Sequence, residues 1–169
     1  MRRRAFVASL AAGSAGVVTG CVGGGSEVVT VVQRSITIPP GDGWVKEVPD
    51  VSDPGGAVQY TAQSSDPFHV YFFTSEQAYM YYHTYVSGDE PALTPGGHDE
   101  ISTAATETGD NSYGAATGES GSRVSVSESG PYFFVLDHSD YRDETVPADD
   151  ADRVSVFLNL TVTERRFGL

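Results

Sequence analysis

The sequence predicts an all-β fold, an antiparallel β-sandwich of about eight short strands with one short helix. Apolar and polar residues alternate with a period of two in short segments, and Gly, Pro, Asp and Ser bound most of these segments. The chain has 169 residues, with 8 Phe and 9 Tyr, which is enough apolar surface for one domain with its own core. Many short strands between such turns are typical of sandwiches and barrels.

Four strands are predicted in the first half of the chain: 28–38 (one long strand or two short ones), 44–51, 57–64 and 68–74. Pro39 and Pro40 end the first of them, and residues 54–56 turn the chain before the third. In the fourth, Phe72 faces one side of the sheet while Tyr71 and Phe73 face the other. Apolar residues on both faces predict a central, doubly covered strand.

One helix is predicted at residues 75–85, where the two-residue alternation stops. Two pairs four residues apart each fall on a single helical face, Tyr81 with Tyr85 or Ala78 with Tyr82. Thr74 with Gln77 has the spacing of a capping box, which places the start of the helix just after Thr74.

The second half of the chain starts with a weak segment and then recovers its pattern. Residues 88–121 are rich in Gly, Ser, Thr and Asp. Because an unstructured insert of this length is unusual in a compact domain, weak strands are predicted at 100–107 and 112–117. Stronger strands follow at 123–126, 132–137 and 154–163. The last alternates most regularly and predicts a strand with one buried face.

The amino-terminal segment has the order of features found in an export signal. Arg3 and Arg4 stand before Phe6 and an uncharged run that extends to Gly20. This run contains several Gly, Ser and Thr residues and falls short of the roughly 20 strongly apolar residues that a transmembrane helix needs. Its length therefore favours a signal over a membrane span.

The same segment resembles Tat lipoprotein signals. Arg3 to Val7 match the twin-arginine pattern, and Val18 to Cys21 match the lipobox. The resemblance implies export by the Tat pathway, cleavage before Cys21 and attachment of membrane lipid to its sulfur, which anchors the protein on the outer face of the cell membrane. Cys21 is the only cysteine, so an internal disulfide is excluded. The alternative is an ordinary cleaved signal that leaves Cys21 free or modified at its amino group.

These features divide the chain into three parts. Residues 1–20 are the expected Tat lipoprotein signal peptide, 21–27 the lipidated cysteine with a Gly-rich tether, and 28–169 a single β-sandwich domain. A tether of this length reaches about 12 Å as a random coil. The domain is therefore expected to lie close to the membrane.

The charge of the chain is strongly negative, with 23 acidic and 10 basic residues. From Cys21 onward, seven basic residues stand against all 23 acidic ones, which gives a formal net charge of −16. This composition, in which Lys46 is the only lysine, resembles that of proteins from extreme halophiles. Nucleic acid is excluded as a partner, because its phosphates would be repelled and the sequence has no basic stripe.

A second resemblance lies near the end of the chain. The sequence "ESGPYFFVLDHSDY", followed by a charged loop and an alternating strand, resembles the closing hairpin of GOLD-type and bacterial pre-peptidase-type sandwiches. The similarity covers Gly130 to Val162. It implies a jelly-roll or GOLD-like sandwich that binds other proteins or accompanies enzymes, with no catalytic residues to carry over.

The sequence contains no pattern typical of an enzyme or a redox protein. Asp137, His138 and Ser139 are adjacent, but neighbours on a strand point to opposite faces and so do not form a catalytic triad. Small copper proteins need a cysteine ligand, and the only cysteine is Cys21. The histidines lack the close spacing of a zinc motif: His69, His83, His98 and His138. No cofactor is predicted.

Two groups of side chains remain as candidate sites. The first could hold a calcium or magnesium ion after a strand end, although the acidic composition scatters carboxylates at similar density: Asp137, Asp140, Asp143 and Glu144. The second could stack on sugars or anchor a partner, although core packing beneath the helix is the favoured interpretation: Tyr79, Tyr81, Tyr82, Tyr85 and Trp44.

A candidate modification site lies in the last strand. Asn159, Leu160 and Thr161 form an N-glycosylation sequon. The alternation of the strand places the Asn159 side chain on the outward face, where a glycan could be attached.

Three functions remain open. The sequence favours a non-enzymatic, membrane-anchored sandwich that binds an unidentified protein or glycan at the cell envelope. The second is a sugar- or substrate-binding accessory lipoprotein of a transporter or surface enzyme. The third, a hydrolase, is disfavoured because no catalytic motif is present. A concave pocket with buried polar groups would favour the second and third over the first.

Overall fold

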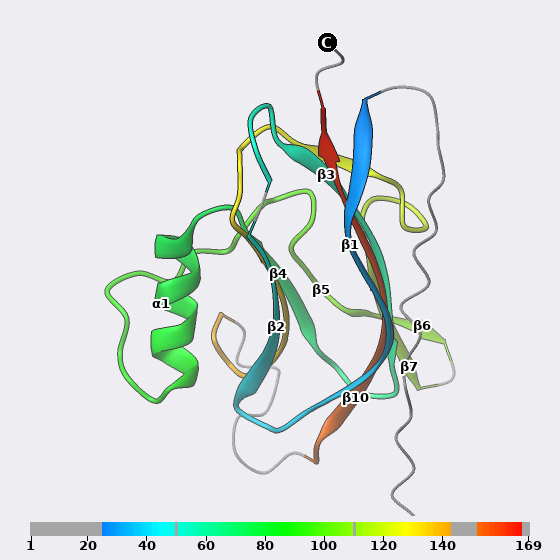
Figure 1. Ribbon diagram of the computed structural model, residues 1–169. Coiled ribbons are helices and arrows are strands. Elements are labelled where there is room, and N and C mark those ends of the chain that lie inside the picture. Colours follow the sequence, from blue (N-terminus) through cyan, green and yellow to red (C-terminus); the bar gives the residue numbers. More distant parts are fainter. Residues whose placement is uncertain (1–24, 50, 110, 143–151, 167–169) are drawn as a thin grey trace, which may run out of the picture.

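The computed structural model describes residues 25–49, 51–109, 111–142 and 152–166. Over these residues the chain is an antiparallel β-sandwich with one helix on its outside (Figure 1). The all-β class predicted from the two-residue alternation is confirmed. No helix among the described residues is long and apolar enough to cross a membrane.

The larger sheet has six strands. Its order is β1 (Ser26–Ile38), β10 (Val154–Arg165), β3 (Gly56–Ser64), β7 (Ser112–Ala116) and β6 (Thr106–Gly109), and β8 (Val124–Val126) also pairs with β3. β1 is one long strand rather than two, with a register shift between Val28 and Thr30 where it pairs with β10. The weak segment between residues 100 and 117 forms short strands, as predicted, and two of them, β5 and β6, lie at sheet edges.

The smaller sheet has four strands and carries the helix. Its order is β2 (Asp42–Val48), β9 (Tyr132–His138), β4 (His69–Phe73) and β5 (Thr103–Ala104). The helix α1 (Glu76–Val86) follows β4 and lies on the side of this sheet that faces away from the larger one (Figure 1).

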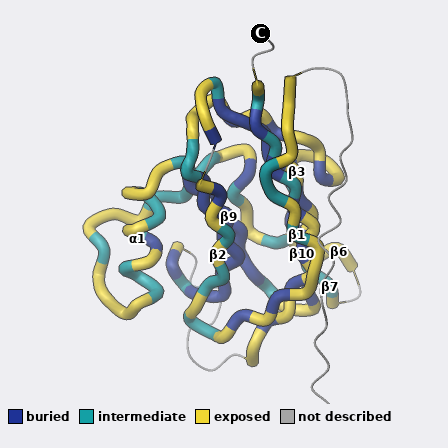
Figure 2. The backbone as a smooth tube through the Cα atoms, in the orientation of Figure 1, coloured by how far each residue is buried: buried dark blue, intermediate teal, exposed yellow. Residues whose placement is uncertain are grey.

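The main core lies between the two sheets, where the buried segments of both meet (Figure 2). β10 shows how the sequence builds it, because its apolar positions from Val154 to Val162 are buried and alternate with outward polar or exposed ones. β4 and β9 are buried at every position. Their second face is covered by α1, so the prediction of a doubly covered strand at residues 68–74 is confirmed.

The cap of α1 differs from the prediction. The helix starts after Ser75, whose hydroxyl accepts a hydrogen bond from the Ala78 N–H at 3.2 Å. A serine oxygen that accepts from the third following N–H is a standard N-cap, and it leaves no such role for Thr74. The capping box proposed for Thr74 and Gln77 is therefore wrong by one residue.

The resemblance to a closing hairpin also needs correction. β9 belongs to the four-stranded sheet and β10 to the six-stranded sheet, so the two strands do not pair. The connection between them crosses from one layer of the sandwich to the other. The alternation in both strands was visible in the sequence, but which sheet each would join depends on long-range pairing.

Candidate functional site

A buried carboxylate lies at the end of β9, beneath α1. Asp137 is fully buried, and its Oδ1 accepts hydrogen bonds from the hydroxyls of Tyr82 and Ser139, each at 2.7 Å. Its Oδ2 has no hydrogen-bond partner in the described part of the chain. Burial raises the pKa of Asp137 to about 6, and the hydroxyl donors offset only part of this effect.

A glycine on β2 makes the contact between helix and sheet close. Gly43 pairs with Asp137 across β2 and β9, and a Cβ atom at Gly43 would lie 1.8 Å from the Tyr82 hydroxyl oxygen. Any larger residue at this position would displace Tyr82 from Asp137. Gly43 therefore leaves the space in which the Tyr82 hydroxyl reaches Asp137.

The structure describes only the first part of the loop that the sequence predicts as an ion-binding site. The Tyr85 hydroxyl donates to Asp140 Oδ1 at 2.6 Å, and this bond raises the pKa of Tyr85 to about 12. Asp137 and Asp140 thus both accept from tyrosines of α1, while Asp143 and Glu144 lie outside the described residues. No group of three or more His, Cys, Asp or Glu among the described residues is arranged to hold a metal ion.

The tyrosines of α1 pack against the sheet. Tyr82 is 3% exposed, and Tyr79 stacks on Phe133 with ring centroids 4.3 Å apart. Tyr85 meets Tyr141 edge to face at 5.3 Å. Trp44 lies elsewhere, on β2, with the Arg34 guanidinium 5.7 Å from its ring centroid. The packing interpretation therefore agrees with these contacts.

The residues considered for a triad are not arranged as one. Ser139 shares its face with Asp137, to which it donates, and His138 between them belongs to the other face. His69 is buried on β4, where its ring stacks parallel to that of Tyr71 at 5.9 Å. Both histidines are integrated into the sheet rather than directed at a common reaction centre.

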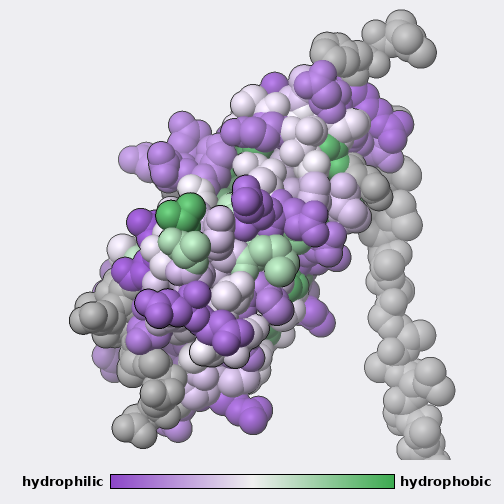
Figure 3. Space-filling view, turned by 90° about the vertical axis from the view of Figure 1, so that its left-hand side faces the viewer, coloured by the Kyte–Doolittle hydropathy of each residue, from purple (hydrophilic) through white to green (hydrophobic). Residues whose placement is uncertain are grey.

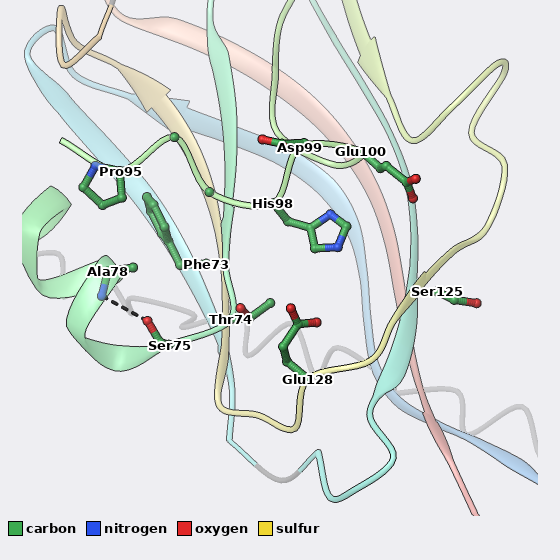
Figure 4. Close-up of a pocket in the computed structure, with 12 residues that line it drawn as sticks. Phe73, Thr74, Ser75, Ala78, Pro95, His98, Asp99, Glu100, Ser125 and Glu128 are labelled. Atoms are coloured by element: carbon green, nitrogen blue, oxygen red, sulfur yellow. Dashed lines mark hydrogen bonds between the residues drawn. The ribbon is translucent and has the colours of Figure 1, made fainter.

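An open groove lies between the start of α1 and the loop at residues 95–100 (Figure 4). Its volume is about 670 Å³, and Phe73 and Pro95 form part of its wall. The loop is fixed because the His98 N–H donates to the Phe72 carbonyl at 2.7 Å and the His98 carbonyl accepts from the N–H groups of Ile101 and Ser102. The backbone thus positions the His98 ring at the groove.

The groove is lined by acidic side chains from two separate segments. Asp99 and Glu100 follow His98 directly, and Glu128 reaches the same space from the loop before β9, as Figure 4 shows. The Nδ1 atom of His98 is buried and has no hydrogen-bond partner among the described residues. Three carboxylates beside an apolar wall offer favourable contacts to an ammonium or guanidinium group.

The sequence had not indicated this groove. The sequence offers His98 only as a possible metal ligand and gives no signal for Glu128. The two residues are far apart in sequence, so no local pattern links them. They come together because β4 pairs with β9, which follows the Glu128 loop, while the His98 loop is hydrogen-bonded to Phe72 of β4.

The outward position predicted for Asn159 is correct. Asn159 is exposed on β10, between Gln33 of β1 and Thr61 of β3. The residues expected to direct export and lipidation, Arg3, Arg4, Phe6 and Cys21, lie outside the described residues.

Comparison with known proteins identifies no family. No protein-family model matches the chain, and no curated protein matches it either.

Replacement of Asp137 by Asn should stabilise the protein at neutral pH. Because the folded pKa of about 6 lies above the ordinary value of 3.8, the wild-type chain loses stability as pH rises through this interval. Two pKa units correspond to about 3 kcal/mol. The unfolding free energies of Asp137→Asn and wild type are measured by urea titration. The value for the variant minus the value for wild type should increase by about 3 kcal/mol from pH 4 to pH 7. A difference that stays constant with pH would contradict the assignment.

Proposed function

We propose that the chain is a non-enzymatic lipoprotein that binds a cationic group of a partner at the outer face of the cell membrane. The observation that carries the proposal is the position of Cys21. β1 starts at Ser26, so only residues 22–25 separate the proposed lipid from the folded sandwich. A lipid on Cys21 would hold the domain within about 12 Å of the membrane.

The acidic groove supports the choice of a cationic ligand. Asp99, Glu100 and Glu128 are exposed, so they remain hydrated and able to exchange water for an ammonium or guanidinium group. The wall formed by Phe73 and Pro95 suits the apolar stem of a lysine or arginine side chain. A basic segment of a neighbouring envelope protein has this chemistry.

Binding is favoured over catalysis by the same geometry. A nucleophile with a hydrogen-bonded base is the usual signature of a hydrolase, and the described residues contain no such pair at the groove. The accessory role in sugar binding stays as the alternative, since the groove also presents the hydroxyls of Thr74, Ser75 and Ser125. GOLD-like membership would fit the protein-binding role.

Substitution of Cys21 by Ser should release the protein from the membrane without unfolding it. The lipid would be lost, and the net charge of −16 gives the domain no attraction for an anionic surface. Fractionation should find wild type in the membrane pellet and Cys21→Ser in the medium. A serine variant that still pellets would show that something other than a lipid on this residue holds the protein.

Substitution of Glu128 by Gln should weaken binding of trilysine to the mature protein. Loss of one charge-assisted contact of about 1 kcal/mol lowers affinity about fivefold. Calorimetric titration in dilute buffer measures this, with Glu107→Gln as the matched control because Glu107 is exposed on β6 and does not line the groove. Equal affinities of the two variants would refute the groove as the cation site. Binding of a neutral oligosaccharide in place of trilysine would favour the accessory role.

A further inference from the structure

The outer face of the six-stranded sheet differs from the rest of the molecule in charge. On the three adjacent strands β1, β10 and β3, no outward position carries an acidic residue. The register of these strands assigns the following residues to that face: Val28, Val31, Gln33, Ser35, Thr37, Ser155, Phe157, Asn159, Thr161, Thr163, Ala57, Gln59, Thr61 and Gln63. We call these residues the neutral face. Next to Thr163, Ser26 pairs with Arg165 and Arg123 donates to the Thr163 hydroxyl, so the border of the neutral face at this end is cationic rather than acidic.

This absence is unusual for the chain, because 23 of its residues are acidic. Glu27 and Glu164 do belong to β1 and β10, but they pair with each other in the register of the inward side, and Glu164 is buried. The surface that includes α1 is mostly hydrophilic, with small separate hydrophobic patches (Figure 3). The neutral face therefore departs from the acidic character of the chain as a whole.

The neutral face also presents large apolar side chains to solvent. Val31 is 62% exposed and Phe157 46%, and Val28 is exposed on the same side of β1. Ser, Thr, Asn and Gln fill the positions around them. A surface of this composition can be dehydrated at much lower cost than one that carries carboxylates.

We propose that the neutral face binds the neutral face of a second copy of this chain. The distribution of charge favours a second copy of the chain as the partner. An approach through the acidic groove brings carboxylates of like sign together, whereas this one brings none from the outward positions of the three strands. An isologous pair needs a self-complementary surface, and a sheet face of hydroxyls, amides and a few apolar groups can meet that requirement through sheet-on-sheet packing.

Anchoring gives the pair its orientation, and this step rests on the proposed function. Two copies in one membrane must both place the start of β1 toward the lipid. A two-fold axis parallel to the strands satisfies this condition, because it leaves both Ser26 residues at the same end. Along such an axis, positions of the middle strand β10 in one copy lie opposite the same positions in the other.

The area of the neutral face indicates a weak pair. Three strands about 4.8 Å apart and about eight residues long cover about 400 Å² per copy. The total lies below the size of a standard stable interface. Confinement of both copies to one membrane raises their effective concentration, which compensates for a small interface. The pair is therefore expected in the membrane rather than in dilute solution.

The test uses thiol cross-linking of the full chain in cell membranes. Asn159→Cys and Ser155→Cys place a thiol on β10, and Ser155→Cys leaves the sequon intact. Met80→Cys, on the exposed side of α1, is the control. With a short bis-maleimide, both β10 variants should yield a band of twice the monomer mass, and Met80→Cys and wild type should not. Recovery of each variant in the membrane pellet is measured first, so that failure of anchoring is distinguished from failure of pairing.

A charge substitution provides the second arm. Phe157→Glu in the Ser155→Cys background puts a carboxylate of each copy at the interface and should lower the cross-linked fraction at least tenfold. Met80→Glu in the same background is matched to it, because Met80 is 47% exposed and Phe157 is 46% exposed, and should change nothing.

The opposite results would overturn the proposal. These are equal cross-linking of Met80→Cys, no effect of Phe157→Glu, or β10 cross-links only to chains of another mass. Cross-linking of Asn159→Cys but not of Ser155→Cys would also overturn it, because a glycan on Asn159 would then occupy the neutral face.

Discussion

The excess of acidic over basic side chains is the constraint on which the rest of the structure depends. With 23 acidic and 10 basic residues, carboxylates must stay hydrated and apart, or be held by donors where they are buried. Of the acidic residues that the structure describes, only Asp137 and Glu164 are buried. Tyrosine and serine hydroxyls bind the first, and the hydroxyl and N–H of Ser52 bind the second, whose pKa is lowered by these bonds.

The two buried carboxylates have opposite relations to the fold. Glu164 accepts from Ser52 near the protein surface, so its charged form is stabilised and joins the end of β10 to the loop after β2. Asp137 lies under α1, where burial outweighs its hydrogen bonds and favours the neutral form. Near neutral pH the buried Asp137 becomes charged, which weakens the contact between α1 and the sheet. The contact between Glu164 and Ser52 is strongest at that pH, because Glu164 is then charged.

Sequence patterns predicted the elements well and their long-range relations poorly. Alternation in β10 and the apolar faces of β4 identified the core strands, because a period of two reports burial directly. The same pattern could not assign β9 and β10 to different sheets, since either pairing buries the same residues. The close approach of Gly43 to Tyr82 and the groove between Glu128 and His98 also had no local signal. Both arise only when strands distant in sequence pair.

The most direct test of the charge account is the dependence of the unfolding free energy on salt concentration. Screening acts mainly between 0.01 and 0.3 M, where the Debye length falls from about 30 Å to less than 10 Å. The account predicts that the unfolding free energy of the mature protein in potassium chloride rises steeply over this interval and more slowly toward molar salt. Sucrose, which strengthens burial without screening, should not reproduce the steep part. An unfolding free energy that is independent of salt, or that rises as steeply with sucrose as with potassium chloride, would contradict the account.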